Sequence, residues 1–138
     1  LAMRRPDLYS AVVDLSGGIG CSTDTEYFFE QMKNIPMKRL HSAFGDLSKF
    51  RGSEYDIGYY AKKNIEEKVD MPRLFLAVGE NDFIRDVVRK DRDMLRNLGY
   101  DLYYEEAPGY GHDWDFWDKY FQIALDEWLP LKRKPVGI

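Results

Sequence analysis

Residues 73–78, with the sequence RLFLAV, constrain the fold of this chain more than any other stretch. The stretch is apolar almost without a break and ends in a Gly-Glu-Asn-Asp turn. Strands with one solvated face alternate apolar and polar residues, whereas the strands of a parallel sheet are covered on both faces and are apolar throughout. Residues 73–78 therefore predict a buried strand of a parallel sheet.

The segments around this strand continue an alternation of strands and helices. The expected strands are 9–16, 73–78 and 101–106, and the expected helices are 56–67, 85–98 and 113–129. Gly99 and Pro130 are typical stop signals for the last two helices. Strands and helices that alternate through short connections are typical of right-handed parallel crossover units. The sequence thus predicts an α/β fold of parallel strands with crossover helices.

The helix expected at 113–129 carries six large or apolar side chains on one face. They are Trp114, Trp117, Phe121, Ala124, Leu125 and Trp128. A stripe of this kind is what packing against a sheet requires, so we expect these residues to form part of the core.

Residues 20–70 form a less regular excursion. Gly, Pro, Ser and Asp are scattered there among short apolar patches, with a possible helix at 25–33 and a second at 56–67 capped by Ser53 or Asp56. The excursion contains too many aromatic residues to be a solvated linker, although its aromatics could equally form a small core of their own.

Composition excludes several classes of function. The 138 residues are 44% hydrophobic, enough for one core, and indicate one domain or part of one. The net charge of -4 offers no basic field for nucleic acid or an anionic membrane, and no apolar run approaches the roughly 20 residues of a membrane span. A single cysteine, Cys21, cannot form an intrachain disulfide, which favours a reducing compartment such as the cytoplasm. The oligomeric state is not indicated.

Two polar residues follow neighbouring predicted strands. Asp82 follows residues 73–78 at the end of a Gly-Glu-Asn-Asp turn, and His112 follows residues 101–106 by a glycine-flanked turn. Functional groups collect at the carboxyl ends of parallel strands, and an acid followed by a histidine matches the chain order Ser, Asp, His of α/β-hydrolases. Taken singly, Asp82 is more simply a helix cap and His112 a structural histidine; taken together, they favour a catalytic pair.

Other candidates fit a catalytic role less well. Ser16 lacks a glycine two positions earlier and is expected in a loop or pocket wall, and nothing beside Cys21 in the sequence would activate its thiol. His41 has no partner in the sequence. Asp113 and Asp115 flank the start of a helix, where negative charge is favourable, so we expect no metal or other cofactor beside His112.

Three motifs carry a resemblance to a known family. They are LFLAVGENDF at 74–83, LRNLGYDLYYEE at 95–106 and GHDWDFWD at 111–118. Together they resemble the C-terminal part of the esterase D group of serine hydrolases, which includes acetyl, feruloyl and acetylxylan esterases and S-formylglutathione hydrolases. The resemblance extends from Ala2 to Leu129. Tyr110 makes the glycine turn one residue longer than that group's pattern.

The resemblance implies a carboxylic ester hydrolase acting on acetyl, short-acyl or carbohydrate-linked esters, with Asp82 and His112 as the acid and base of a Ser-His-Asp triad. The nucleophile elbow Gly-x-Ser-x-Gly would then precede Leu1. Residues 1–138 would form the C-terminal part of one α/β-hydrolase domain, with 20–70 contributing to the substrate pocket. This chain would need its N-terminal half as a partner and would be inactive alone. A non-catalytic α/β binding module, or a degenerate hydrolase, is the alternative.

Overall fold

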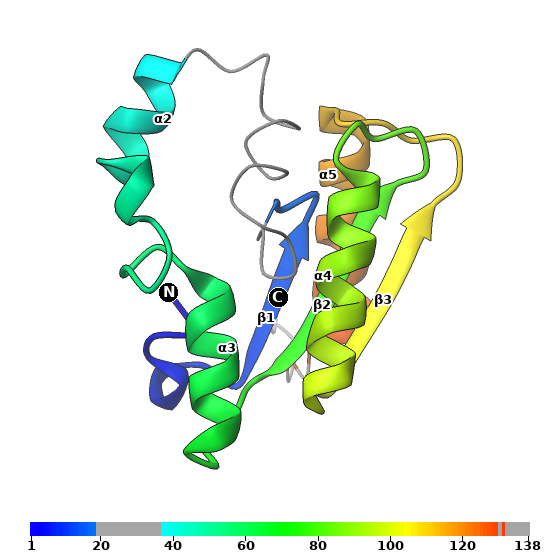
Figure 1. Ribbon diagram of the computed structural model, residues 1–138. Coiled ribbons are helices and arrows are strands. Elements are labelled where there is room, and N and C mark those ends of the chain that lie inside the picture. The colour runs from blue at the N-terminus through cyan, green and yellow to red at the C-terminus, as the bar shows by residue number, and fades with distance from the viewer. Residues whose placement is uncertain (19–36, 130, 132–138) are drawn as a thin grey trace, which may run out of the picture.

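The computed structural model describes residues 1–18, 37–129 and 131. Its centre is a sheet of three parallel strands in the order β1 (Ala11–Leu15), β2 (Arg73–Gly79) and β3 (Leu102–Ala107) (Figure 1). In register, Val13 lies beside Phe75, and Phe75 lies beside Tyr103. The α/β class and the parallel strands predicted from the sequence are therefore confirmed.

Helices cover both faces of this sheet. The helices α3 (Ile57–Glu66) and α4 (Arg85–Leu98) lie on one face, and α5 (Trp114–Ile123) lies on the other (Figure 1). Leu74, Leu76 and Val78 of β2 pack towards α3 and α4, while Ala77 packs beneath α5. Every residue of β2 after its first is buried, as expected of a strand covered on both faces.

Shorter elements occupy the chain between β1 and β2 and at the two ends. They are η1 (Pro6–Leu8), α2 (Met37–Phe44), η2 (Leu47–Lys49) and η3 (Ala124–Trp128). The described part of the 20–70 excursion is thus largely helical, and the helix expected at 25–33 lies outside the described residues. Asp56 caps α3 as predicted, because its carboxylate accepts the backbone amide of Tyr59 at 3.0 Å.

The end of α4 shows why the helix stops where the sequence predicts. Gly99 adopts a φ of 95°, and the amides of Gly99 and Tyr100 turn back to the carbonyls of Arg96 and Leu95. Such a left-handed cap satisfies carbonyls that the helix leaves unpaired. The Tyr100 hydroxyl then donates to the Ala61 carbonyl at 2.8 Å, which ties the end of α4 to α3.

The prediction that the aromatic stripe of the last helix belongs to the core is wrong for two of its members. Trp114 is 81% exposed and Phe121 is 58% exposed. The buried face of α5 carries Phe116 and Tyr120 instead, because the small side chains Ala77 and Ala107 leave room for their rings over the sheet. Helical spacing alone could not distinguish these two apolar faces.

The same helix is also shorter than predicted. Regular α-helix ends at Ile123 and a wider π-helical turn, η3, continues to Trp128. This turn brings the Trp128 ring parallel to Phe75, with centroids 5.8 Å apart, so the end of the segment still packs on the sheet. Among the described residues, no helix is both long and apolar enough to cross a membrane.

Candidate active site

The carboxyl ends of β2 and β3 lie side by side and carry two loops. Residues 80–84, here called the acid turn, connect β2 to α4, and residues 108–113, the histidine loop, connect β3 to α5. Because the strands are parallel neighbours, both loops emerge at the same edge of the sheet. The fold thus brings Asp82 and His112 together although 30 positions separate them.

His112 contacts Asp82 directly. Its Nδ1 lies 3.0 Å from Oδ2 and 3.2 Å from Oδ1 of the carboxylate. The aspartate side chain is fully buried, whereas the imidazole is 35% exposed and is flanked by the rings of Phe83 and Trp117 at centroid distances of 4.7 and 5.0 Å. The predicted contact is confirmed. With Nδ1 turned to the carboxylate, Nε2 is the nitrogen available to a third group.

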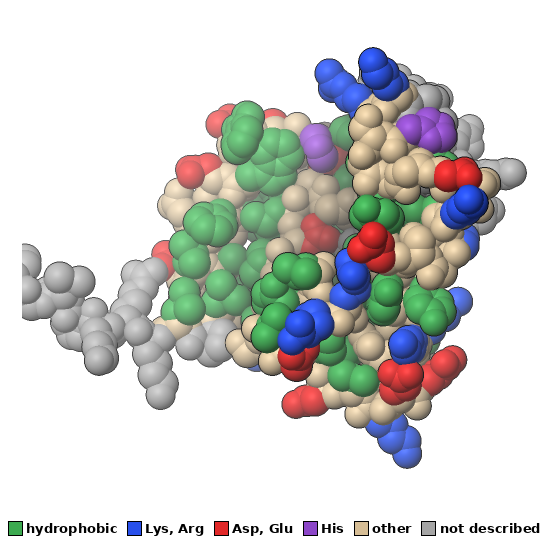
Figure 2. Space-filling model, turned by 90° about the vertical axis from the view of Figure 1, so that its left-hand side faces the viewer, with side chains coloured by type: hydrophobic (Ala, Val, Ile, Leu, Met, Phe, Trp, Pro, Cys, Tyr) green, Lys and Arg blue, Asp and Glu red, His purple; other side chains and the backbone are tan. Residues whose placement is uncertain are grey.

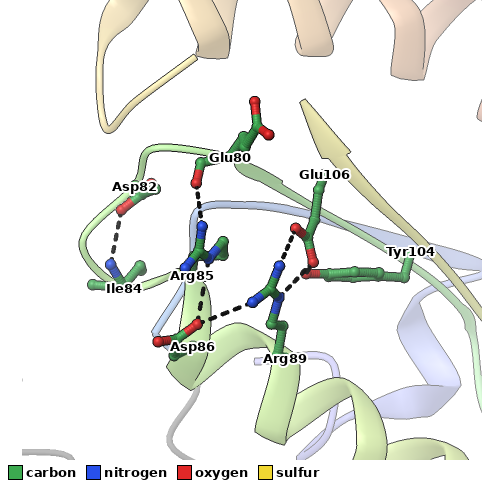
Figure 3. Close-up of polar contacts among 8 residues, drawn as sticks. All are labelled: Glu80, Asp82, Ile84, Arg85, Asp86, Arg89, Tyr104 and Glu106. Carbon is green, nitrogen blue, oxygen red and sulfur yellow. Dashed lines mark hydrogen bonds and ion pairs between the residues drawn. The ribbon is translucent and has the colours of Figure 1, made fainter. Parts of the chain in front are cut away.

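Asp82 also meets part of the simpler expectation that it supports the start of a helix. Its Oδ1 accepts the backbone amide of Ile84 at 3.0 Å, a local turn typical of aspartate (Figure 3). No side-chain hydrogen bond caps α4 itself. The carboxylate therefore fixes the acid turn through Oδ1 and faces His112 mainly through Oδ2.

Backbone contacts hold the acid turn against the histidine loop. The amide of Asn81 donates to the carbonyl of Tyr110 at 2.8 Å, and the amide of Gly109 donates to the Glu80 carboxylate at 3.1 Å. A Cβ on Gly79 would lie 2.5 Å from the Tyr110 oxygen, closer than such contacts occur, so only glycine allows this approach. The two loops are thus one packed unit.

The same contacts explain the extra residue in the glycine turn. Tyr110 accepts the hydrogen bond from Asn81 through its backbone, and its ring packs against Phe116 and Tyr120 at centroid distances of 6.1 and 6.3 Å. The longer loop is therefore anchored at its additional position, and His112 still reaches Asp82.

Asp113 holds both the histidine loop and the start of α5. One carboxylate oxygen accepts the amide of Phe116 at the start of α5, and the other accepts the amide of Gly111, both at 3.0 Å. This is the cap of α5, and it also sets the turn just before His112. Across the described residues, no group of three or more His, Cys, Asp or Glu side chains is arranged to hold a metal ion.

Ser16 belongs to this site, although the sequence predicts for it only a loop or a pocket wall. It lies at the end of β1, is 6% exposed, and its hydroxyl donates to Asp82 Oδ2 at 2.6 Å. The signal that could have identified it is positional: Ser16 follows β1 directly, just as Asp82 closely follows β2, so both lie at the same sheet edge.

The two other candidates lie elsewhere. His41 is near the end of α2, is exposed, and its Nδ1 lies 3.0 Å from the Gly45 carbonyl oxygen, so its place is at a helix end. Cys21 lies outside the described residues.

A second polar cluster supports α4 beside the acid turn (Figure 3). Arg85 donates to the Glu80 carbonyl at 2.7 Å, and Arg89 binds both carboxylate oxygens of Glu106 at 2.7 and 2.6 Å. The Tyr104 hydroxyl also donates to Glu106 at 2.7 Å. The hydrogen bonds from Arg89, followed by that from Tyr104, lower the pKa of Glu106 to about 2. This cluster fixes the first turns of α4 relative to β3.

Side chains of β1 and α5 together form an apolar face. We use this name for Val13, Leu15, Trp114, Trp117 and Phe121, which together with Asp118 line an open groove of about 620 Å³. Figure 2 shows hydrophobic side chains gathered on this side of the molecule. Among the described residues, β1 pairs only with β2, so its other edge adjoins this face.

Comparisons with known proteins point to esterases. No family model matches the chain. An acetyl esterase of Caldicellulosiruptor saccharolyticus is 44% identical over 89 residues, which are 62% of this chain and 32% of that protein. This chain therefore spans about a third of that relative.

Solved structures give the same result at the level of the fold. The fluorophosphonate-binding serine hydrolase FphF of Staphylococcus aureus superposes with a TM-score of 0.73 at 23% identity, covering 90% of this chain and 46% of that structure. The S-formylglutathione hydrolase FrmB of the same species gives 0.74 at 23% identity with the same coverage. A ferulic acid esterase gives 0.60 at 20% identity, covering 90% and 43%.

These chains are each matched over less than half of their length. The chain therefore has the fold of one portion of an α/β-hydrolase, and its predicted resemblance to esterases is confirmed in sequence by the acetyl esterase match.

Proposed function

We propose that this chain supplies the acid, Asp82, and the base, His112, of a Ser-His-Asp triad in a carboxylic ester hydrolase. The observation that carries the proposal is the 3.0 Å contact between His112 Nδ1 and the fully buried Asp82 carboxylate at the ends of two adjacent parallel strands. The similarity to an acetyl esterase over 89 residues supports ester hydrolysis as the reaction.

The geometry suits the chemistry of acyl transfer. Asp82 accepts the Nδ1 proton of His112, which fixes the tautomer and leaves Nε2 unprotonated to take the proton of a serine hydroxyl as that oxygen attacks the ester carbonyl. The imidazolium then returns the proton to the departing alcohol. Water repeats the sequence on the acyl-enzyme and releases the acid, so no cofactor is consumed.

The serine would come from outside this chain. We infer that residues 1–138 form the C-terminal part of one α/β-hydrolase domain, and that the preceding part brings the nucleophile elbow and the oxyanion hole. The open edge of β1 and the apolar face are where that part would pack, since large exposed apolar patches mark surfaces that another segment covers. The coverage of less than half of each related structure supports this division.

Substrate choice would rest on residues 20–70. This excursion leaves the sheet at the end of β1, the same edge that carries Asp82 and His112. Segments at that edge shape specificity in open α/β sheets. The acetyl esterase similarity favours acetyl or other short-acyl esters, including acyl groups on carbohydrates.

The test uses the complete polypeptide that contains this chain and p-nitrophenyl acetate as substrate. His112→Ala and Asp82→Asn are each expected to lower kcat by a factor on the order of 10⁴, because the remaining triad members act only as a unit. Asp93→Asn is the matched control for Asp82→Asn: Asp93 is exposed and paired with Arg92 on α4, so kcat should stay within about twofold.

Two results would contradict the proposal. One is ester hydrolysis that survives both site substitutions. The other is an upstream sequence without a Gly-x-Ser-x-Gly within roughly one helix length, about 10 to 15 residues, of Leu1, which would favour the non-catalytic binding module. The isolated 138-residue chain is expected to show no turnover. Activity of that chain that His112→Ala abolishes would place a nucleophile within it.

A further inference from the structure

Ser16 adopts a backbone conformation that few residues of its type adopt. Its φ is +58°, in the left-handed region, which costs a non-glycine residue free energy. The residue is held there by two contacts: its amide donates to the Ala77 carbonyl at 2.8 Å, and its hydroxyl donates to Asp82 at 2.6 Å. A glycine would adopt this φ with less strain but would offer no hydroxyl.

The hydroxyl of Ser16 shares one carboxylate oxygen with the base. Oδ2 of Asp82 accepts Ser16 Oγ at 2.6 Å and faces His112 Nδ1 at 3.0 Å, while Oδ1 accepts the amide of Ile84 at 3.0 Å. Hydrogen bonds on both oxygens fix the rotation of the carboxylate about its Cβ–Cγ bond. The Ser16 donor therefore decides which oxygen His112 meets and at what angle.

We propose that Ser16 is a positioning residue that holds the Asp82 carboxylate in the orientation His112 needs, an inference that rests on the esterase function proposed above. A buried carboxylate requires hydrogen-bond donors, and a donor to a charged group is stronger than one to a neutral group. Ser16 supplies such a donor from just after β1, so the segments that follow all three strands each contribute one side chain to a single Ser16–Asp82–His112 chain of contacts.

Two other roles for Ser16 differ in what they predict. As a nucleophile, Ser16 would have to transfer its proton to the imidazole, yet its hydroxyl donates to the carboxylate. As a purely structural tie between β1 and the acid turn, it would affect stability without a selective effect on turnover. The experiment must therefore separate turnover from stability and hydroxyl from backbone strain.

The experiment compares Ser16→Ala and Ser16→Gly in the complete polypeptide, with Ser10→Ala as the matched control. Both Ser16 variants remove the hydroxyl, but only glycine relieves the left-handed strain. Ser10 is exposed and lies at the opposite end of β1. We expect kcat on p-nitrophenyl acetate to fall about tenfold in both Ser16 variants, with KM within about twofold, and no change in Ser10→Ala.

A second readout does not depend on activity. The Nδ1 proton of His112, observed by proton NMR, reports its hydrogen bond to Asp82, and its chemical shift should move in both Ser16 variants but not in Ser10→Ala.

A Ser16→Gly variant with the kcat of the unchanged protein, beside a slower Ser16→Ala variant, would assign the effect to backbone strain and overturn the proposal. An unchanged kcat and an unchanged Nδ1 resonance would also overturn it. If His112→Ala and Asp82→Asn leave hydrolysis intact, the proposed function itself fails; if only the Ser16 variants are silent, this inference alone fails.

Discussion

The junction of the acid turn with the histidine loop and the apolar face of β1 and α5 are both rich in aromatic side chains, but they differ in what those side chains contact. At the junction, the His112 ring lies between Phe83 and Trp117, and its carboxylate partner is fully buried. On the apolar face, Trp114 and Phe121 are largely exposed. At the junction, the contacts between Asp82 and His112 lie within the described residues, whereas the apolar face leaves two large rings exposed.

The two regions therefore differ in how far their structure depends on residues outside those described. The geometry of Asp82 and His112 rests on contacts made by this chain alone, through Asn81, Tyr110 and Gly79. On the apolar face, Trp117 packs against His112 and Trp114, whereas Trp114 and Phe121 leave most of their surface exposed. Substitutions at the junction should therefore act on Asp82 and His112 directly, whereas substitutions of the exposed rings Trp114 and Phe121 should act only if another segment packs on them.

Gly79→Ala is expected to have the largest effect. The new Cβ would lie 2.5 Å from the Tyr110 oxygen and 2.6 Å from the Gly111 oxygen, so the histidine loop must move away from the acid turn. We expect kcat to fall by at least about a hundredfold and the free energy of unfolding by about 3 kcal/mol. Steady-state kinetics and urea denaturation of the complete polypeptide measure both.

Gly99→Ala is the matched control for this substitution. Gly99 has a φ of 95°, but a Cβ there would meet no atom within 4 Å, so alanine adds backbone strain of about 1 kcal/mol without a steric contact. Its kcat should not change. A Gly79→Ala variant that keeps its activity would mean that the two loops are not held by this close approach.

Phe121→Ala tests whether another segment covers the apolar face. If the preceding part of the domain covers the apolar face, removal of this ring should lower the free energy of unfolding of the complete polypeptide by about 3 kcal/mol, as in a core. In the isolated chain, where Phe121 is 58% exposed, the same change should reduce self-association, measured by sedimentation velocity.

Phe116→Ala is the control on the opposite face of the same helix. Phe116 is fully buried over the sheet, so its removal should destabilise the protein whether or not another segment packs on α5. A complete polypeptide that loses stability through Phe116→Ala but not through Phe121→Ala would show the apolar face to be an ordinary surface.

The arrangement of strands and the proximity of Asp82 to His112 could be predicted from the sequence because both depend on local patterns. Residues 73–78 are apolar throughout, and Asp82 and His112 each follow a strand, so parallel topology alone places them at one edge. The hydrogen bond from Ser16 to Asp82 joins positions 66 apart and matches no sequence motif, so the sequence indicates only that Ser16 lies at the same sheet edge, directly after β1. The exposure of Trp114 could not be predicted, since helical periodicity does not say which of two apolar faces meets the sheet.

Asp14 lies in β1, on the opposite face of the strand from Val13. Burial raises the pKa of its carboxyl to about 6, the nearby Asp91 carboxyl adds to the rise, and the backbone amide of Gly17 opposes it. A raised pKa in the folded state means that ionisation of Asp14 opposes folding. Its contribution to stability is therefore most favourable below about pH 4 and is lost as the pH rises through 6.

Asp14→Asn should accordingly stabilise the complete polypeptide by on the order of 2 kcal/mol at about pH 8 and by nothing at about pH 4. Thermal or urea unfolding at the two pH values measures the difference. Asp101→Asn is the control, because Asp101 is 71% exposed in its ion pair with Arg73 and should change stability by less than about 0.5 kcal/mol at either pH. Equal effects of Asp14→Asn at both pH values would mean that its carboxyl ionises as freely as an exposed one.

Glu106→Gln is expected to have the smallest effect and tests whether the junction needs its polar support. Arg89 binds both oxygens of Glu106 at 2.7 and 2.6 Å, and these contacts lower its pKa to about 2, so the stability they contribute is present above about pH 5 and is lost as the pH falls towards 2. We expect the free energy of unfolding to fall by about 1 kcal/mol at about pH 7 and to be unchanged at low pH. The kcat should fall less than about threefold, because this cluster supports α4 and does not contact Asp82 or His112. Glu67→Gln, which breaks an exposed 3.9 Å pair with Lys63, should change neither quantity. A loss of kcat as large as that of Gly79→Ala would contradict a junction held mainly by its own backbone contacts.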